Sequence, residues 1–156
     1  MSVAFRREGD DEHMEPKFEL PLPSGPNWVT ARGLRLTRER LDALEAVDVG
    51  AMDEDAGKKH KRVVRYWRTR LSTAELRPAP DGETVAFGCA VTYRLNGREK
   101  MVALVGDDEA DPAEGRISFS SPLARAMMGA EVGERVDFAG KDEAVEIVAI
   151  GLNDEA

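Results

Sequence analysis

Three consecutive acidic residues, Asp53, Glu54 and Asp55, form the first group in this sequence that could do chemistry. Carboxylate oxygens suit Mg²⁺, and one or two of them can hold the ion when a partner supplies the remaining ligands. Acids are equally favoured in the first turn of a helix, where the helix dipole stabilises each by about 0.3–1 kcal/mol. If Asp53 is an N-cap, Glu54 and Asp55 occupy that turn. The residue types alone leave both interpretations open.

A basic run without any acid follows this cluster. Its members are Lys58, Lys59, Lys61, Arg62, Arg65, Arg68 and Arg70. On a helix, Lys58, Lys61, Arg62 and Arg65 are spaced i, i+3, i+4 and i+7 and share one face, and we call these four the basic stripe. A solvated helix face would explain the stripe. Because unrelieved like charge destabilises a helix, an anionic partner such as a nucleic-acid phosphate backbone would explain it as well.

Autonomous catalysis has little support in the sequence. His13 falls in the N-terminal arm, His60 in the basic run, and Cys89 in the middle of a predicted strand, where a buried inert thiol is usual. The sequence contains no nucleophile elbow, phosphate-binding glycine loop or paired Cys-x-x-Cys motif. We therefore expect a protein that is not an enzyme in its own right.

Composition narrows the class of protein. The chain of 156 residues fits one domain or two small ones, and its single cysteine rules out an intramolecular disulfide and suits a reducing compartment. No apolar run has the length of a signal peptide or a membrane span, which predicts a cytoplasmic protein with no membrane partner. The net charge of −8 argues against broad nucleic-acid binding, although the charge is distributed asymmetrically.

Two helices are expected to position the acids and the basic stripe. Residues 1–28 are rich in proline and predict an irregular arm, partly docked on the body through its apolar side chains. Residues 29–77 predict an antiparallel helical hairpin, with Thr30 capping the first helix and the second running from about Asp55 to Leu76. The expected apolar seams are Leu34, Leu41, Leu44 and Val47 on the first helix and Val64, Trp67, Leu71 and Ala74 on the second.

The pattern changes at Pro78, after which alternating apolar residues predict strands. The predicted strands are residues 85–95, 100–106, 116–121, 135–140 and 144–151, with a hairpin turn at Asn96-Gly97. A short helix is expected at 122–129, capped by Ser120 or Ser121. Residues 78–152 therefore predict a small antiparallel sheet packed on one helix, followed by a tail at 153–156. The whole chain is of the α+β class.

Several stretches of this second half resemble the C-terminal domain of the Gre transcript-cleavage factors of bacterial RNA polymerase. These are FGCAVTY, VGDDEAD, ISFSSPLARAMMG and VGERV. Upstream, KRVVRYWRTRLSTAEL resembles the end of the second coiled-coil helix in GreB-type members. The resemblance is good over about residues 62–150 and loose over 29–61, and the arm before Trp28 has no counterpart.

The resemblance implies a coiled coil followed by an FKBP-like β-sheet domain without prolyl isomerase function. It implies that the C-terminal domain grips the rim of the polymerase secondary channel, while the coiled coil passes down the channel towards the nascent RNA 3′ end. Acids at the tip of the coiled coil would help hold a second magnesium ion for cleavage of backtracked RNA. The free protein would then have no metal and no cofactor of its own, and the default expectation is a monomer.

The resemblance also assigns residues. Ser121, Pro122, Leu123, Ala124 and Arg125 match the turn and helix that contact the rim. Ser120 stands where members often have an aspartate, so one charged polymerase contact is expected to be lost. The basic stripe matches the RNA-facing patch of the family in kind, though not residue by residue.

The tip departs from the family pattern. Members with cleavage activity carry Gly-Asp-x-Ser-Glu-Asn there, a motif that is absent here; only Asp48 and Asp53 to Asp55 offer carboxylates. A helix from Asp55 to Leu76 would be roughly 33 Å long, which makes the hairpin about two turns shorter than in the family. We therefore favour a non-cleaving regulator that competes with Gre factors over a factor that stimulates cleavage. A protein-interaction module that kept the fold and, remotely, an autonomous hydrolase stay as alternatives.

Overall fold

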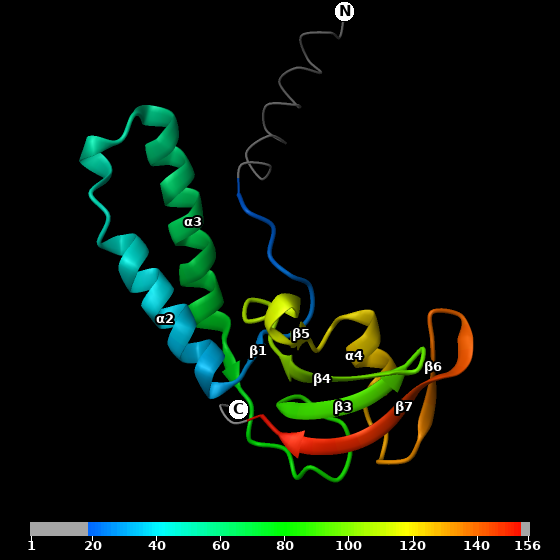
Figure 1. The fold of residues 1–156 in the computed structure, drawn as a ribbon. Helices are drawn as coiled ribbons and strands as arrows, with labels where there is room; N and C mark the ends of the chain where they lie inside the picture. The colour runs from blue at the N-terminus through cyan, green and yellow to red at the C-terminus, as the bar shows by residue number, and fades with distance from the viewer. Residues whose placement is uncertain (1–18, 154–156) are drawn as a thin grey trace, which may run out of the picture.

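The computed structural model describes residues 19–153, which form a helical hairpin standing on a β-sheet lobe (Figure 1). Most of the predicted arm, residues 1–18 with His13, lies outside the described residues, as do residues 154–156 of the predicted tail. The hairpin consists of α2 (Ala31–Glu45), the short 3₁₀ helix η1 (Val49–Ala51) and α3 (Glu54–Thr73). None of the described helices is long and apolar enough to cross a membrane.

Both predicted helix caps of the hairpin are confirmed. The Thr30 hydroxyl accepts a hydrogen bond from the Gly33 amide at 3.0 Å, and Asp53 accepts one from the Ala56 amide at 2.7 Å. The predicted end of the second helix is wrong, because α3 stops at Thr73 rather than Leu76. Its 20 residues are about 30 Å long at 1.5 Å per residue.

The residues after α3 leave the helix to pair with the arm. Strand β2 (Glu75–Leu76) runs parallel to β1 (Trp28–Val29). The Glu75 amide donates to the Asn27 carbonyl at 2.8 Å, and the Arg77 amide donates to the Val29 carbonyl at 3.2 Å. These hydrogen bonds between residues far apart in sequence replace those that a longer helix would have made, so tertiary pairing overrides local helix propensity.

The hairpin seam is largely as predicted. Leu41 is buried, and the other predicted seam residues inside the helices are half-buried between α2 and α3. Val47 is an exception, since α2 ends at Glu45 and leaves the Val47 side chain 42 % exposed. The Arg40 guanidinium lies over the Trp67 ring at 4.8 Å from its centroid, which closes the seam with a cation–π contact.

The sheet lobe has strand order β5-β4-β3-β7-β6. Its strands are β3 (Cys89–Leu95), β4 (Arg98–Val105), β5 (Arg116–Ser118), β6 (Arg135–Phe138) and β7 (Lys141–Leu152). Asn96 and Gly97 make the predicted turn, with φ of 53° and 76° as a two-residue hairpin loop requires. The pairing is antiparallel except that β5 runs parallel to β4, so the sheet is mixed where a purely antiparallel sheet was expected. The loop between β4 and β5 contains η2 (Pro112–Glu114) and carries the chain back along β4, so that β5 enters the sheet in the same direction as β4.

The main core lies between this sheet and α4 (Pro122–Met127), which covers one face of it (Figure 1). Leu104, Met127, Val145 and Ile147 are fully buried there, together with Cys89. Burial raises the pKa of the Cys89 thiol, so the group stays protonated and unreactive at neutral pH, as the sequence suggested.

Candidate functional site

The acids at the hairpin tip serve mainly as helix caps. Asp48 accepts a hydrogen bond from the Gly50 amide at 2.9 Å, and Asp53 caps α3. Glu54 and Asp55 occupy the first turn, where the Glu54 carboxylate lies 3.4 Å from the Lys58 ammonium. The helix-start interpretation of the cluster is therefore confirmed in geometry.

The same acids do not make a metal site by themselves. Within residues 19–153, no three His, Cys, Asp or Glu side chains come together as possible ligands of one ion. Glu54 and Asp55 are adjacent in the first turn of α3, where side chains at i and i+1 do not face each other.

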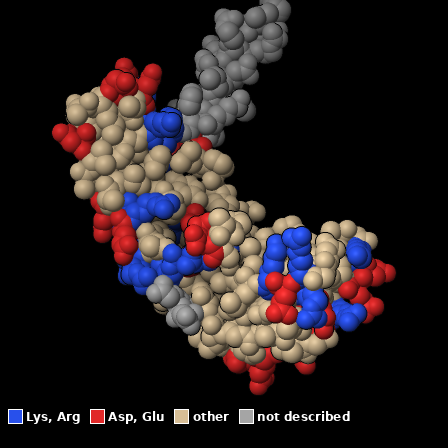
Figure 2. Space-filling view, viewed as in Figure 1, with Lys and Arg blue, Asp and Glu red and all other residues tan. Residues whose placement is uncertain are grey.

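Acids from distant segments form ion pairs with part of the basic run, and the sequence did not predict these pairs. The Arg68 guanidinium lies 2.6 Å from the Glu45 carboxylate across the hairpin, and Arg70 pairs with Asp108 of the sheet lobe. In the basic stripe, Arg65 lies 2.6 Å from the Glu19 carboxylate, while Lys61 is exposed. Figure 2 shows acidic side chains at the free end of the hairpin, and both basic and acidic side chains along the hairpin towards the sheet lobe. The run is thus divided between the surface stripe, an exposed ion pair across the hairpin at Arg68 and a buried ion pair with the sheet lobe at Arg70.

Arg70 is the centre of a buried connection between the hairpin and the sheet lobe. Its side chain is 5 % exposed, and its Nε lies 2.5 Å from Asp108 Oδ2. Asn27 accepts a hydrogen bond from Arg70 Nη2 and donates one to the Arg70 carbonyl, both at 2.8 Å. The Tyr66 hydroxyl donates to Asp108 at 2.6 Å. Burial, and then this hydrogen bond, raise the pKa of Tyr66 to about 12.

Three acids after β4 form the sheet-lobe side of this connection, and we call Asp107, Asp108 and Glu109 the acidic joint. Glu109 accepts hydrogen bonds from the Thr30 hydroxyl at 2.6 Å and from Arg32 Nη1 at 2.9 Å. Asp107 accepts hydrogen bonds from the hydroxyls of Ser118 and Ser120. Asp108 and Glu109 therefore hold the two helices of the hairpin, while Asp107 ties the acidic joint to the segment after β5 within the sheet lobe.

Sequence reasoning missed the acidic joint. The three acids stood out only as part of the VGDDEAD resemblance, and their partners lie 11 to 79 residues away along the chain. A run of acids shortly after a strand whose last residues are mostly buried was the one available signal.

The rim-contacting residues assigned by resemblance surround the start of α4. Ser121 caps the helix by accepting a hydrogen bond from the Ala124 amide, which settles the choice between the two serines. Pro122 and Arg125 are exposed, whereas Leu123 packs against the core. Ser120 is engaged internally, since its hydroxyl donates to Asp107 at 2.8 Å. The carboxylate expected to be missing at position 120 is thus present beside it, on Asp107.

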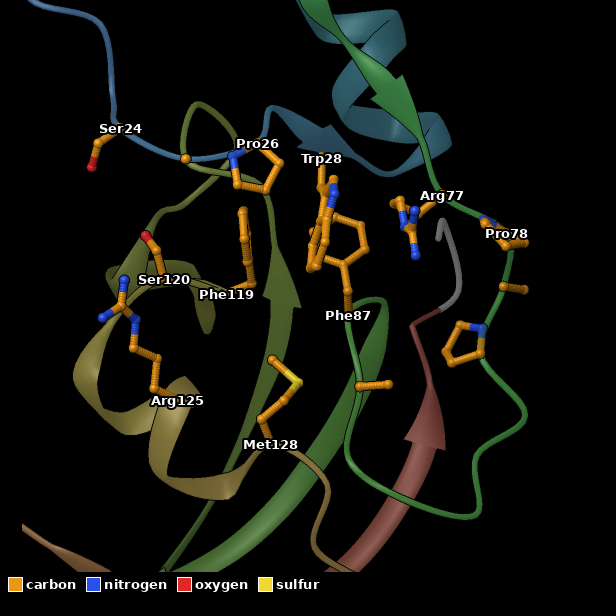
Figure 3. Close-up of a pocket in the computed structure, with 14 residues that line it drawn as sticks. Ser24, Pro26, Trp28, Arg77, Pro78, Phe87, Phe119, Ser120, Arg125 and Met128 are labelled. Atoms are coloured by element: carbon orange, nitrogen blue, oxygen red, sulfur yellow. The ribbon is translucent and has the colours of Figure 1, made fainter.

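A pocket of about 580 Å³ opens next to these residues (Figure 3), and we call it the aromatic pocket. It is lined by Ser24, Gly25, Pro26, Trp28, Arg77, Pro78, Ala79, Pro80, Ala86, Phe87, Phe119, Ser120, Arg125 and Met128. Trp28 stacks on Phe119 with 4.7 Å between ring centroids and meets Phe87 edge-on at 5.8 Å. The Arg77 guanidinium lies over the Trp28 ring. None of these lining residues is acidic, so the pocket suits an apolar group accompanied by negative charge.

Comparisons with known proteins give the family of the chain. The family model "Transcription elongation factor, GreA/GreB, C-term" matches residues 79–151. The chain is 37 % identical over 120 residues to transcription elongation factor GreA of Thioalkalivibrio sulfidiphilus, covering 72 % of this chain and 75 % of that protein. It is 35 % identical over 136 residues to GreA of Vibrio cholerae, covering 71 % and 87 % respectively.

Solved structures show a weaker likeness. The crystal structure of GreA factor homolog 1 (Gfh1) of Thermus thermophilus is 23 % identical in sequence and gives a TM-score of 0.37. The match covers 81 % of this chain and 99 % of that chain. The sequence relatives carry the assignment, and they identify an accessory factor rather than an enzyme. The chain belongs to the GreA/GreB family of transcription elongation factors.

Proposed function

We propose that this protein binds RNA polymerase at the rim of the secondary channel and modulates elongation there as a cytoplasmic monomer. The observation that carries the proposal is the surface around the start of α4. Pro122 and Arg125 are exposed there, on a helix fixed by the Ser121 cap, beside the acid-free aromatic pocket. Aromatic and arginine side chains of this kind are typical of the residues that dominate protein–protein binding energy.

A pull-down with purified core polymerase tests the binding surface. Arg125→Glu reverses the exposed charge beside the pocket and is expected to weaken binding by about tenfold or more. Arg98→Glu is the matched control, because Arg98 is also exposed but follows the Asn96-Gly97 turn in the sheet lobe. Absence of binding by the native protein at micromolar concentration, at both low and moderate salt, would contradict the proposal.

We further propose that the hairpin occupies the channel without supplying ligands for a second magnesium ion. Two observations support this. The Asp53 carboxylate caps α3, and the Glu54 carboxylate faces the Lys58 ammonium. Of the three consecutive acids, only Asp55 has no helix-capping hydrogen bond or ion pair recorded in the described structure. In addition, α3 is about 30 Å long, shorter even than the sequence predicted. Since Mg²⁺ binds carboxylates at about 2.0–2.1 Å, a tip that ends several Å away contributes no ligand.

Cleavage of RNA in stalled elongation complexes tests this second part. The informative variant is Asp53→Asn with Glu54→Gln and Asp55→Asn, because asparagine preserves the N-cap while all three carboxylates are removed. We expect the native protein to give no cleavage above that of polymerase alone, and to slow cleavage stimulated by an active Gre factor. Strong cleavage by the native protein that the variant abolishes would refute this part and support a cleavage factor.

A further inference from the structure

The described chain begins with an ion pair on the basic stripe. Arg65 Nε lies 2.9 and 3.1 Å from the two Glu19 carboxylate oxygens, and Arg65 Nη2 lies 2.6 Å from one of them. This hydrogen bonding with Arg65, assisted by the positive charge of Arg62, holds the pKa of Glu19 below its usual range. Glu19 therefore brings the end of the N-terminal segment onto the stripe face of α3.

The segment that precedes Glu19 is strongly acidic. Residues 8–15 read EGDDEHME and contain five acids: Glu8, Asp10, Asp11, Glu12 and Glu15. The stripe and the neighbouring Lys59 carry five positive charges: Lys58, Lys59, Lys61, Arg62 and Arg65. The two charge sets are equal in number and opposite in sign, and two of the cations, Lys58 and Arg65, also face Glu54 and Glu19.

The chain is long enough to bring them together. Glu15 precedes Glu19 by four positions, and four residue steps of extended chain span about 13 Å at about 3.3 Å per residue. The basic stripe extends about 10 Å along α3 from Arg65 to Lys58, at 1.5 Å per residue. Starting from the Glu19–Arg65 contact, residues 8–15 can therefore reach every cation of the stripe.

We propose that residues 8–15 dock on the basic stripe as an intramolecular acidic mask. The mask occupies the cations that would otherwise contact an anionic partner, so it weakens the binding of a phosphate backbone to α3. The docking itself requires no polymerase. Its consequence for transcription rests on the function proposed above, since the stripe would then face RNA in the channel.

Zero-length carbodiimide cross-linking of the full-length protein tests the docking directly. The reagent joins a carboxylate to a lysine amine only when the two are in contact. We expect peptides from residues 8–15 linked to Lys58, Lys59 or Lys61 in the monomer band, and loss of these links at high salt because exposed ion pairs are screened. Absence of the links, links to lysines elsewhere, or links found only between two copies would overturn the proposal.

Binding of a short fluorescein-labelled single-stranded RNA tests the masking. The masking variant converts Glu8, Asp10, Asp11, Glu12 and Glu15 to their amides. The control variant converts five exposed acids of the sheet lobe to amides, namely Glu83, Glu114, Glu131, Asp142 and Glu143, and so changes the net charge equally. We expect the masking variant to bind RNA about tenfold tighter than the native protein at low salt, and the control variant to change affinity much less.

Two results of the RNA experiment would overturn the masking. Equal tightening by both variants would assign the effect to net charge, and no tightening by the masking variant would show that the segment does not cover the stripe. Neither measurement contains polymerase, so failure of the polymerase pull-down leaves both readouts unaffected.

Discussion

Removing the carboxylate of Asp108 is the sharpest test of how the hairpin is held on the sheet lobe. Asp108→Ala leaves the Arg70 guanidinium, whose side chain is 5 % exposed, without its acidic partner. It also removes the acceptor of the Tyr66 hydroxyl. Asn27 still accepts from Arg70 Nη2, but a neutral amide oxygen does not balance the charge.

The expected cost follows from the burial of this pair. Breaking a buried ion pair by removing one partner costs about 3–5 kcal/mol of unfolding free energy. Glu45→Ala is the matched control, because it removes the acid that faces Arg68 in a pair whose side chains are 60 % and 43 % exposed. Exposed pairs contribute about 0–1 kcal/mol. The two variants should therefore differ by several kcal/mol although both delete one carboxylate beside one arginine.

Urea unfolding at neutral pH measures both costs. Trp67 on α3 and Trp28 in the aromatic pocket report on the two parts of the molecule, so Trp67→Phe and Trp28→Phe backgrounds follow each part separately. A further double variant, Arg70→Met with Asp108→Leu, should regain most of the lost stability because it leaves no buried charge. A cost of Asp108→Ala no larger than that of Glu45→Ala would refute the argument that the joint depends on a buried charge.

Two further predictions concern the same contact region. Tyr66→Phe removes a hydroxyl whose pKa is about 12 in the folded protein and about 10 in the unfolded chain, so its contribution to stability is complete below pH 10 and is lost as pH rises towards 12. The difference in Tm between the native protein and the variant should therefore shrink over that range. A difference in Tm that stays constant would contradict the assignment. Gly106→Ala places a Cβ 2.3 Å from the Trp28 carbonyl oxygen and should lower the free energy of unfolding in urea by about 1–3 kcal/mol. Gly57→Ala lies in α3 with nothing within 4 Å of the added Cβ and should raise the free energy of unfolding by about 0.5–1 kcal/mol. Changes of the same sign in both variants would show that the close approach of β1 to Gly106 does not exclude a larger side chain.

Local features were predictable because they depend on neighbours in the sequence. The caps at Thr30 and Asp53 require only a side-chain oxygen within reach of an amide three residues later. The Asn96-Gly97 turn requires two residues that tolerate positive φ. Heptad-like and period-two patterns identified the hairpin and most strands, because burial on one face imposes those periods.

The candidate site was predictable only in part. The start of α4 was identified because Ser121 and Pro122 form a local signal. The aromatic pocket was not, since Trp28, Phe87 and Phe119 come from three separate segments. Arg70 belongs to the same run as Lys58, and nothing in their spacing distinguishes a buried cation from an exposed one.

By itself, the sequence determined the two helices, their caps, the strand-forming half and the resemblance that gave the family. Only the tertiary structure decided which charges face water. It paired Arg70 with Asp108, Arg68 with Glu45 and Arg65 with Glu19, and it drew Glu75–Leu76 out of the helix and onto β1. The physical reason is that helix and turn formation depend on hydrogen bonds within a few residues. The partner of a charge, and the strand beside which a segment lies, depend instead on groups 23 to 47 residues away.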